Sequence, residues 1–268
     1  MNKKLPFLCF LLVLNAGWVL AQTAALPDPL LMNNGQRVKT PKQWHTQRRK
    51  ELLELFANEM YGRAPERPAS MRFEVFEEDH NALNGKATRK QVAVYFNGKS
   101  DEPRMDLLIY IPNHVKGRVP AILGLNFWGN HAIHPDPKIR ITQSWTESGK
   151  GNPYVNLSCV VNHQATEACR GINANQWPID SILARGYALV TAYREDIASD
   201  DAKTGFQKGV HTLYPDFQTR GDNFGTIAAW AWALSRAVDY LVTDKAIDAK
   251  KIAVFGWSRL GKAALWAG

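Results

Sequence analysis

The segment from Asp248 to Gly268 constrains the fold more than any other part of the chain. A short apolar strand, Ile252 to Phe255, runs into Gly256-Trp257-Ser258-Arg259-Leu260-Gly261, and a helix-forming stretch follows. A serine on a tight turn between a strand and a helix is the arrangement called a nucleophile elbow. The turn holds the hydroxyl outside the sheet, and the helix directs backbone N–H groups toward a developing oxyanion. The segment therefore predicts a serine nucleophile at position 258.

The turn departs from the common pattern G-x-S-x-G at one position. That pattern has glycine at position 260, where this chain has Leu260 and places glycine at 261. We expect Gly256 to leave room for the sharp turn and the backbone N–H of Arg259 to be one oxyanion donor. The alternative is a fortuitous Gly-x-Ser at a helix start, which the preceding apolar strand and the following helix disfavour.

Two cations follow the serine closely. Lys262 lies four residues after Ser258 and therefore on the same helical face. A cation in the first helical turn opposes the helix dipole by about 0.3–1 kcal/mol, and Arg259 adds like-charge repulsion. This placement is easier to understand if an electron-rich group binds there, such as an oxyanion or the oxygens of a sugar. The alternative is that both side chains point to solvent.

Strand-like and helical segments alternate along the rest of the chain. The extended segments that we predict are residues 91–96, 105–110, 120–125, 187–193 and 252–255. The last three are short apolar runs of the kind that a sheet buries on both faces. The predicted helices are one that starts at Thr40-Pro41 and ends near Gly62, one over 179–184 and one over 223–242. This order predicts an α/β fold whose sheet is mainly parallel and carries helices on both faces. Residues 128–177 have few periodic signals and are expected to loop near the active site.

The first residues have the three-part layout of a secretory signal peptide. Lys3 and Lys4 precede an apolar run over residues 5–20, and Ala21 ends a small-residue cleavage site. The run is short for a bilayer of roughly 30 Å. We therefore expect residues 1–21 to be removed, 22–39 to form an irregular leader, and 40–268 to belong to one domain. The mature protein is expected to be secreted or periplasmic and not membrane-bound.

Composition excludes other classes of function. The 268 residues are 45% hydrophobic, which is enough for one sizeable core. The formal charge of +8 comes from scattered basic residues without a nucleic-acid-binding motif, so we expect no nucleic-acid partner. Beyond the signal, Cys159 and Cys169 remain, either as a disulfide or as two separate buried thiols.

The elbow and several other segments resemble a known family. Gly-x-Ser-Arg-Leu-Gly-Lys, followed by Ala-Ala-Leu-Trp-Ala-Gly, resembles the glucuronoyl esterases, also called 4-O-methyl-glucuronoyl methylesterases. Residues 227–232, 235–241, 125–131 and 176–178 look like the bacterial members. The resemblance covers roughly residues 90–268, and its Ser-Arg-x-Gly-Lys part is the most specific.

The resemblance implies a fold, a reaction and three site residues. Members of the family have an α/β-hydrolase fold and cleave the ester between glucuronic acid on xylan and an alcohol of lignin. Ser258 matches their nucleophile, and Arg259 matches an arginine credited with oxyanion stabilisation through its backbone and guanidinium. Lys262 matches a lysine that contacts the uronate sugar. The resemblance implies no metal and no organic cofactor, and we expect a monomer.

The rest of the catalytic machinery is expected outside this sequence. In this fold the triad follows the order serine, acid, histidine along the chain, and the residues after Ser258 include neither an acid nor a histidine. We therefore expect a C-terminally truncated fragment that is inactive by itself, with both groups beyond Gly268. His131 could line the pocket, although a loop-stabilising hydrogen bond is the favoured interpretation. Gly129-Asn130 could lend a backbone donor, and Asn126 lies at the same strand end.

Aromatic and polar side chains give weaker candidates for substrate contacts. Trp128, Trp145 and Trp177 could stack on sugar faces or simply pack within the fold. Arg170 and Gln176 could reach the pocket, and the helical tryptophans Trp230, Trp232 and Trp266 are expected in the core. An acetyl-xylan or other carbohydrate esterase is the alternative enzyme. A non-catalytic, hydrolase-like wall-binding protein is the alternative of a different class.

Overall fold

The computed structural model describes residues 26–148, 157–201 and 203–268. The predicted signal peptide, residues 1–21, lies outside the described residues. The chain divides into two compact units, Met1–Leu52 and Leu53–Gly268, and each is described by itself.

The first unit is a turn followed by helix. Leu31 and Arg37 form an isolated antiparallel bridge in the turn. Helix α1 (Pro41–Gln43) begins as predicted, because the Thr40 hydroxyl accepts a hydrogen bond of 3.1 Å from the backbone N–H of Gln43. A π-helical turn (Trp44–Arg48) continues into α2 (Arg49–Phe56). Arg48 is buried and donates to the Pro29 carbonyl at 2.9 Å, which ties the turn to the helix.

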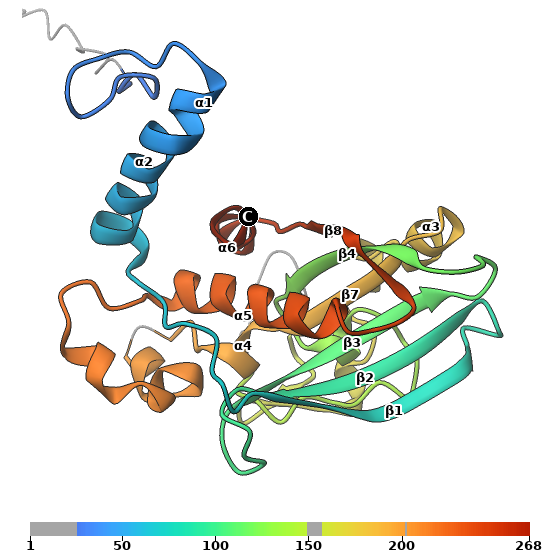
Figure 1. The fold of residues 1–268 in the computed structure, drawn as a ribbon. Helices are drawn as coiled ribbons and strands as arrows, with labels where there is room; N and C mark the ends of the chain where they lie inside the picture. Colours follow the sequence, from blue (N-terminus) through green and yellow to red (C-terminus); the bar gives the residue numbers. More distant parts are fainter. Residues whose placement is uncertain (1–25, 149–156, 202) are drawn as a thin grey trace, which may run out of the picture. The chain divides into compact units, whose positions relative to one another are not determined.

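The second unit contains a mixed six-stranded sheet in the order β1-β2-β3-β7-β4-β8 (Figure 1). Its strands are β1 (Arg72–Ala82), β2 (Ala87–Tyr95), β3 (Arg104–Pro112), β4 (Val119–Asn126), β7 (Ala188–Tyr193) and β8 (Ile247–Val254). The pairs β1–β2, β2–β3 and β3–β7 are antiparallel, whereas β4 is parallel to both β7 and β8. The parallel part therefore lies at the end of the sheet that carries the elbow.

Four helices and several short turns complete this unit. The helices are α3 (Ile179–Ala184), α4 (Arg194–Ile197), α5 (Thr226–Leu241) and α6 (Arg259–Ala267), and a π-helical turn (Ala57–Tyr61) precedes the sheet. The 3₁₀ turns are Asn130–Ala132, Glu167–Cys169, Ala174–Gln176, Gly205–Gln207, Gly209–Leu213 and Pro215–Thr219, and a small hairpin joins β5 (Val160–Val161) to β6 (Gln164–Ala165). The predicted helix over 223–242 and the one over 179–184 are confirmed.

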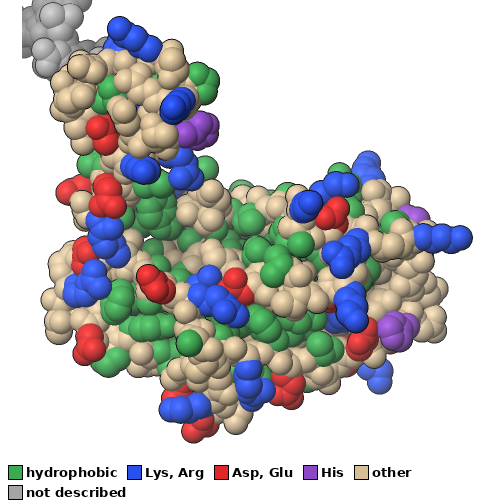
Figure 2. All heavy atoms as spheres, in the orientation of Figure 1, with side chains coloured by type: hydrophobic (Ala, Val, Ile, Leu, Met, Phe, Trp, Pro, Cys, Tyr) green, Lys and Arg blue, Asp and Glu red, His purple; other side chains and the backbone are tan. Residues whose placement is uncertain are grey.

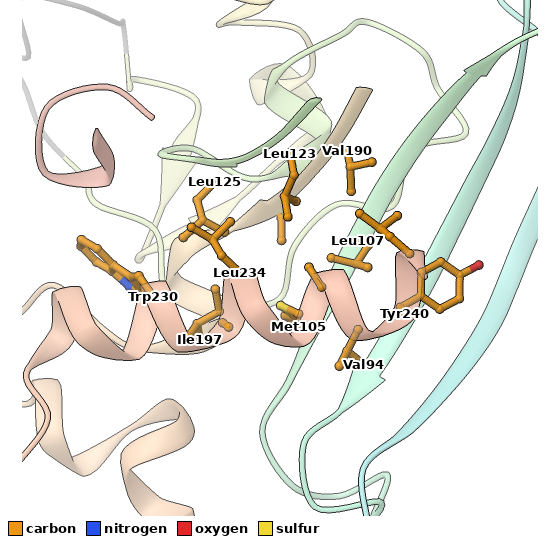
Figure 3. Close-up of a cluster of buried hydrophobic side chains, with 14 of the residues drawn as sticks. Val94, Met105, Leu107, Leu123, Leu125, Val190, Ile197, Trp230, Leu234 and Tyr240 are labelled. Carbon is orange, nitrogen blue, oxygen red and sulfur yellow. The ribbon is translucent and has the colours of Figure 1, made fainter. Parts of the chain in front are cut away.

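Helices cover both faces of the sheet, as predicted. Leu107 and Ile109 of β3 belong to the core that α5 and α6 close. Leu108 and Tyr110, on the alternate face, pack in a second core together with residues of α3. Figure 3 shows side chains of α5, including Trp230 and Leu234, meeting those of the strands.

The burial of strand β8 differs from the prediction, whereas that of β4 and β7 agrees with it. All six residues of β7 are buried, and β4 is mostly buried. The segment 252–255 was also predicted to be buried on both faces, but β8 has exposed and half-buried positions, and Phe255 is 39% exposed. The reason is position: within the described residues β8 stands at the end of the strand order and pairs only with β4.

Strand β1 was not predicted at all. Its sequence, Arg-Phe-Glu-Val-Phe-Glu-Glu-Asp-His-Asn-Ala, is largely charged, and most of its side chains are exposed or half-buried. It forms the other edge of the sheet, where pairing with β2 needs backbone hydrogen bonds but little apolar surface. An apolar-run criterion therefore misses it.

The two cysteines left open by the sequence form a disulfide. Cys159 and Cys169 are bridged with their Cα atoms 5.2 Å apart. The bridge packs against Trp128 in a small third core. It closes the loop that carries the β5–β6 hairpin.

The surface shown in Figure 2 carries interspersed charges. Lys and Arg side chains alternate with Asp and Glu on this face, without one large basic patch. Among the described helices, none combines the length and the apolar character needed to cross a bilayer.

Candidate active site

Ser258 lies at the junction of the strand and helix that the sequence predicts. It is the N-cap residue of α6 and has φ 55° and ψ −130°, a conformation that non-glycine residues rarely adopt. Backbone strain of this kind persists only where the surroundings enforce it, and it concentrates at functional sites. The residue is exposed, so its hydroxyl is presented to solvent rather than packed in the core.

Two glycines explain the departure from the common elbow pattern. A Cβ atom on Gly256 would lie 2.1 Å from the carbonyl oxygen of Leu260, so no side chain fits there. A Cβ on Gly261 would lie 3.1 Å from the carbonyl oxygen of Gly256. The first turn of α6 therefore rests against the strand end through Gly256 and Gly261. Leu260 is free to point inward and is buried in the main core.

The first turn of α6 leaves a backbone donor for an oxyanion. The N–H groups of Leu260 and Gly261 donate to the Trp257 carbonyl at 3.0 and 3.2 Å. The N–H of Arg259 makes no hydrogen bond with any residue in the described part of the chain. This is the donor that the sequence predicts, and the positive end of the helix dipole adds to it.

The Arg259 side chain is turned toward the segment that follows β7. Its Nη2 lies 2.8 Å from Oδ2 of Asp200. Its guanidinium carbon lies 5.5 Å from the centre of the Phe127 ring, and the side chain is 44% exposed. Lys262 is exposed and forms no ion pair within the described residues. Of the two cations that sequence reasoning grouped together, one is therefore anchored and the other extends into solvent.

Asp200, which is half-buried, contacts a buried ion pair that sequence reasoning missed. Its Oδ2 also lies 3.2 Å from Nη1 of Arg194, and Arg194 pairs in turn with Glu195. The side chains of Arg194 and Glu195 are each 1% exposed. Burial raises the pKa of Glu195, and the charge of Arg194 opposes that rise. No periodic or motif signal in the sequence marks these residues, because their contacts are formed only in the folded sheet.

A second buried carboxylate follows in the same helix. Asp196 of α4 accepts hydrogen bonds from the hydroxyls of Ser144 at 2.6 Å and Thr142 at 3.1 Å. Burial, together with the neighbouring charge of Asp106, raises the pKa of Asp196 to about 7. Burial also raises the pKa of Asp106, against the influence of Arg104 and Arg140.

The loop after β4 is held in place by Asn126. Asn126 is buried, and its Oδ1 accepts the Gly129 N–H at 2.8 Å. Its Nδ2 donates to Oδ1 of Asn130 at 2.7 Å and to the Thr191 hydroxyl at 3.1 Å. Of the suggested donor pair Gly129-Asn130, the Gly129 N–H is therefore already used inside the loop, and the Asn130 N–H stays a predicted donor.

His131 plays neither of the roles considered for it. It is fully buried, and both ring nitrogens lack a hydrogen-bond partner within the described residues. Burial lowers the pKa of His131 to about 4, so the ring is neutral. The ring fills the space beside Gly129, where an added Cβ would lie 2.6 Å from it. The prediction of a loop-stabilising hydrogen bond from the His131 side chain is therefore wrong for the described residues. The backbone carbonyl of His131 instead accepts a hydrogen bond of 2.9 Å from the Gly171 N–H.

A pocket of about 380 Å³ opens beside the elbow and gathers some of the predicted contacts. Trp177 and Gln176 line it, and Trp177 packs edge-on against Phe255 with ring centres 5.6 Å apart. The other lining residues are Leu125, Phe127, Asn173 and Trp257. The pocket therefore adjoins the residue that precedes the serine.

The remaining candidates lie elsewhere, as packing or structural groups. Trp128 is buried beside the disulfide, and Trp145 stacks on His163 with ring centres 5.0 Å apart. Arg170 donates to the carbonyls of Asp136 and Ile139, which makes it a loop anchor. The helical tryptophans pack as expected: Trp230 and Trp232 are buried, and Trp266 packs against the main core.

The described residues supply no complete triad. In this part of the chain, no histidine hydrogen-bonds to the Ser258 hydroxyl. Nor does the described part bring together three His, Cys, Asp or Glu side chains able to hold a metal ion. The absence of a metal or organic cofactor stays a prediction.

Comparisons with known proteins agree on one family. A family model described as glucuronyl esterase, fungi, matches residues 147–268. Carbohydrate esterase MZ0003 of an unknown prokaryotic organism is 44% identical over 245 residues, which are 91% of this chain and 55% of that protein. A 4-O-methyl-glucuronoyl methylesterase 1 of Phanerochaete chrysosporium is 29% identical over 150 residues, covering 50% of this chain and 31% of that protein.

Solved structures give the same result. A glucuronoyl esterase from Solibacter usitatus superimposes with a TM-score of 0.80 at 42% identity, covering 90% of this chain and 59% of that one. A promiscuous CE15 esterase from a marine bacterial metagenome gives a TM-score of 0.77 at 43% identity with the same coverage. The chain thus spans somewhat more than half the length of these relatives. The fold is that of the α/β hydrolases, and the elbow, the sheet and these similarities together support the glucuronoyl esterase family, of bacterial type, for this chain.

Proposed function

We propose that this protein is a serine carboxylic-ester hydrolase that cleaves 4-O-methyl-glucuronoyl esters linking glucuronoxylan to lignin alcohols. The observation that carries the proposal is the strained, exposed Ser258 at the start of α6, next to the N–H of Arg259, which has no hydrogen-bond partner within the described residues. An ester hydrolase needs a presented hydroxyl and a donor aimed at the oxyanion, and this corner supplies both. The similarity to glucuronoyl esterases supports the substrate class.

The proposed reaction has two steps. The Ser258 oxygen attacks the ester carbonyl carbon, and the Arg259 N–H and guanidinium stabilise the tetrahedral oxyanion. The bond between the carbonyl carbon and the alcohol oxygen then breaks. The alcohol leaves with the proton that the Ser258 hydroxyl lost to the general base, and an acyl-enzyme on Ser258 remains. Water attacks that acyl group and releases the uronic acid, restoring the hydroxyl. Lys262 would contact hydroxyl or ring oxygens of the uronate sugar from the exposed face of α6.

The general base is the part of this mechanism with no counterpart beside Ser258 in the described residues. A histidine oriented by a carboxylate, later in the chain than the serine, is what the order of residues in this fold predicts. That assignment stays a prediction.

Export is proposed on two grounds. The first residues have the layout of a signal peptide, and disulfides such as Cys159–Cys169 form in oxidising compartments. We therefore propose a secreted or periplasmic location. A monomeric state stays a prediction.

The test compares wild-type protein with Ser258→Ala, each expressed from the complete gene. Wild type should hydrolyse benzyl glucuronate, and Ser258→Ala should lose at least about 10³-fold in kcat/KM, because no covalent intermediate can form. A fluorophosphonate probe should label the Ser258 peptide in wild type only. Ser181→Ala, which removes an exposed serine on α3, is the matched control and should keep full activity.

Three outcomes would contradict the proposal in different ways. Hydrolysis of acetylated xylan without hydrolysis of benzyl glucuronate would assign an acetyl esterase instead. Activity that survives Ser258→Ala would remove the nucleophile. A wild-type protein that hydrolyses no ester but still binds glucuronoxylan would indicate a non-catalytic wall-binding protein.

A further inference from the structure

The contact between Arg259 and Asp200 joins two strand ends that lie far apart in the sequence. Asp200 follows β7, Arg259 follows β8, and both strands run parallel to β4, which lies between them. Their carboxyl ends therefore meet at one edge of the sheet. There the guanidinium of Arg259 and that of Arg194 both approach the same oxygen, Oδ2 of Asp200, at 2.8 and 3.2 Å.

Asp200 is itself held rigidly. Its backbone N–H donates to Oε1 of Glu195 at 3.1 Å, and Glu195 pairs with the buried Arg194. The stretch before it is fixed to α5, because Nε1 of Trp230 donates to the Ala198 carbonyl at 3.0 Å. The carboxylate therefore occupies one defined place relative to the end of the sheet.

Phe127 supports the guanidinium groups from the other side. The Arg259 and Arg194 guanidinium carbons lie 5.5 and 5.7 Å from the centre of its ring. Arg194 also lies 5.5 Å from the Trp230 ring. The aromatic contact and the carboxylate together restrict the long Arg259 side chain to one orientation next to Ser258.

Stability alone gives little reason for this pair. Arg259 is 44% exposed and Asp200 25% exposed, and ion pairs so open to water add little to the free energy of unfolding. A carboxylate also weakens the net positive charge that an oxyanion would meet. The benefit of the pair is therefore geometric. A guanidinium that is already oriented loses less entropy when it binds the oxyanion, so it stabilises the transition state more.

We propose that Asp200 is a positioning residue, which holds the Arg259 guanidinium ready for the oxyanion formed on Ser258, with Arg194 and Glu195 fixing Asp200 in turn. The inference rests on the proposed function for its catalytic meaning. Asp200 follows a different strand from Ser258 and acts only through Arg259. No covalent bond to Asp200 forms or breaks during the reaction.

The experiment is a double-mutant cycle on the complete protein with benzyl glucuronate as substrate. Asp200→Ala should lower kcat by about 10–100-fold and change KM by less than about 3-fold, because the lost interaction matters in the transition state. In a protein that already carries Arg259→Ala, Asp200→Ala should lower kcat almost no further. Asp200→Asn keeps an acceptor oxygen and should fall between wild type and Asp200→Ala.

Two controls separate positioning from a structural role. Glu74→Ala breaks a comparably exposed arginine pair in β1 and should leave kcat unchanged. Thermal unfolding of Asp200→Ala should stay close to that of wild type. The inference would be overturned if Asp200→Ala lowered kcat equally in wild type and in Arg259→Ala. An unchanged kcat in Asp200→Ala would also overturn it.

A measurement that does not depend on catalysis distinguishes failure of the positioning role of Asp200 from failure of the proposed function. The Nε–H signal of Arg259 in nitrogen–proton NMR, assigned by its loss in Arg259→Lys, should be resolved in wild type and broadened or shifted in Asp200→Ala. If wild type hydrolyses no ester, the proposed function fails, and the NMR comparison still decides whether Asp200 holds Arg259. A signal unaffected by Asp200→Ala would refute the positioning role directly.

Discussion

Two strand-to-helix corners flank β4 at the same edge of the sheet, and they use polar residues in opposite ways. The corner between β8 and α6 exposes Ser258, Arg259 and Lys262 and stores strain in the backbone. The corner between β7 and α4 buries Arg194 and Glu195 and pairs them with each other. The exposed corner can meet a substrate, whereas the buried corner cannot.

The difference indicates a division of roles. Buried charges are costly unless they are paired and well oriented, so the corner after β7 is rigid once formed. An exposed strained turn is reactive but holds its own side chains loosely. The Asp200–Arg259 contact joins the two, so that the rigid corner orients a side chain of the reactive one.

The largest effect is expected from filling the space at the exposed corner. Gly256→Ala places a Cβ 2.1 Å from the Leu260 carbonyl oxygen, so the start of α6 must shift. A displacement of this kind beside the proposed nucleophile, Ser258, should lower kcat/KM by about 10²–10³-fold. Hydrolysis of benzyl glucuronate measures it. Gly221→Ala, where an added Cβ meets nothing within 4 Å, is the control, and equal activity of the two variants would remove the strain argument.

The next effect concerns the buried corner. Arg194→Met leaves the buried Glu195 without its partner, which should lower the free energy of unfolding by about 3–5 kcal/mol. Because burial already raises the pKa of Glu195, the loss should grow as the pH rises and the carboxyl is forced to ionise. Urea unfolding at several pH values measures this. Arg220→Met breaks an exposed pair and should change stability much less; a similar loss in both would mean that burial is not the cause.

A third effect tests the neighbouring buried carboxyl, Asp196. Its pKa is raised from 3.8 to about 7, so between these values the folded protein retains a proton that the unfolded chain releases. The stability of wild type should therefore fall as the pH rises through this window. Asp196→Asn cannot ionise, so its stability relative to wild type should rise by about 3–4 kcal/mol between pH 4 and pH 7.5. A stability difference between Asp196→Asn and wild type that does not change with pH would contradict this.

The smallest effect separates the two exposed cations. Lys262 has no ion-pair partner in the described residues, so Lys262→Ala should leave stability unchanged or slightly raised, because a cation leaves the start of a helix. If it contacts the uronate, KM for benzyl glucuronate should rise by about 3–10-fold with little change in kcat. Lys250→Ala, an exposed cation in β8, is the control. A change confined to kcat would move Lys262 from binding to the chemical step.

Sequence patterns predicted most of the local structure. The helices over 179–184 and 223–242, the buried strands β4 and β7, and the elbow itself have periodic or motif signals, because each depends on neighbours within one segment. Strand β1 had no such signal, since an edge strand is held by backbone pairing with β2. The exposure of β8 was likewise missed, because its place in the strand order is not written in its own residues.

The same division holds for the site. By itself, the sequence located the strand-to-helix turn at Ser258 and the glycine before it, Gly256, that leaves room for that turn. It also predicts Ser258 as the nucleophile and the Arg259 N–H as an oxyanion donor, because the geometry of four consecutive positions is local. Only the tertiary structure decided that Arg259 reaches Asp200, that Asn126 accepts the Gly129 N–H, and that the His131 ring is buried with no hydrogen-bond partner in the described part of the chain. The physical reason is that parallel pairing of β7, β4 and β8 brings their carboxyl ends to one edge, and hydrogen bonds among those ends depend on distances that no linear pattern encodes.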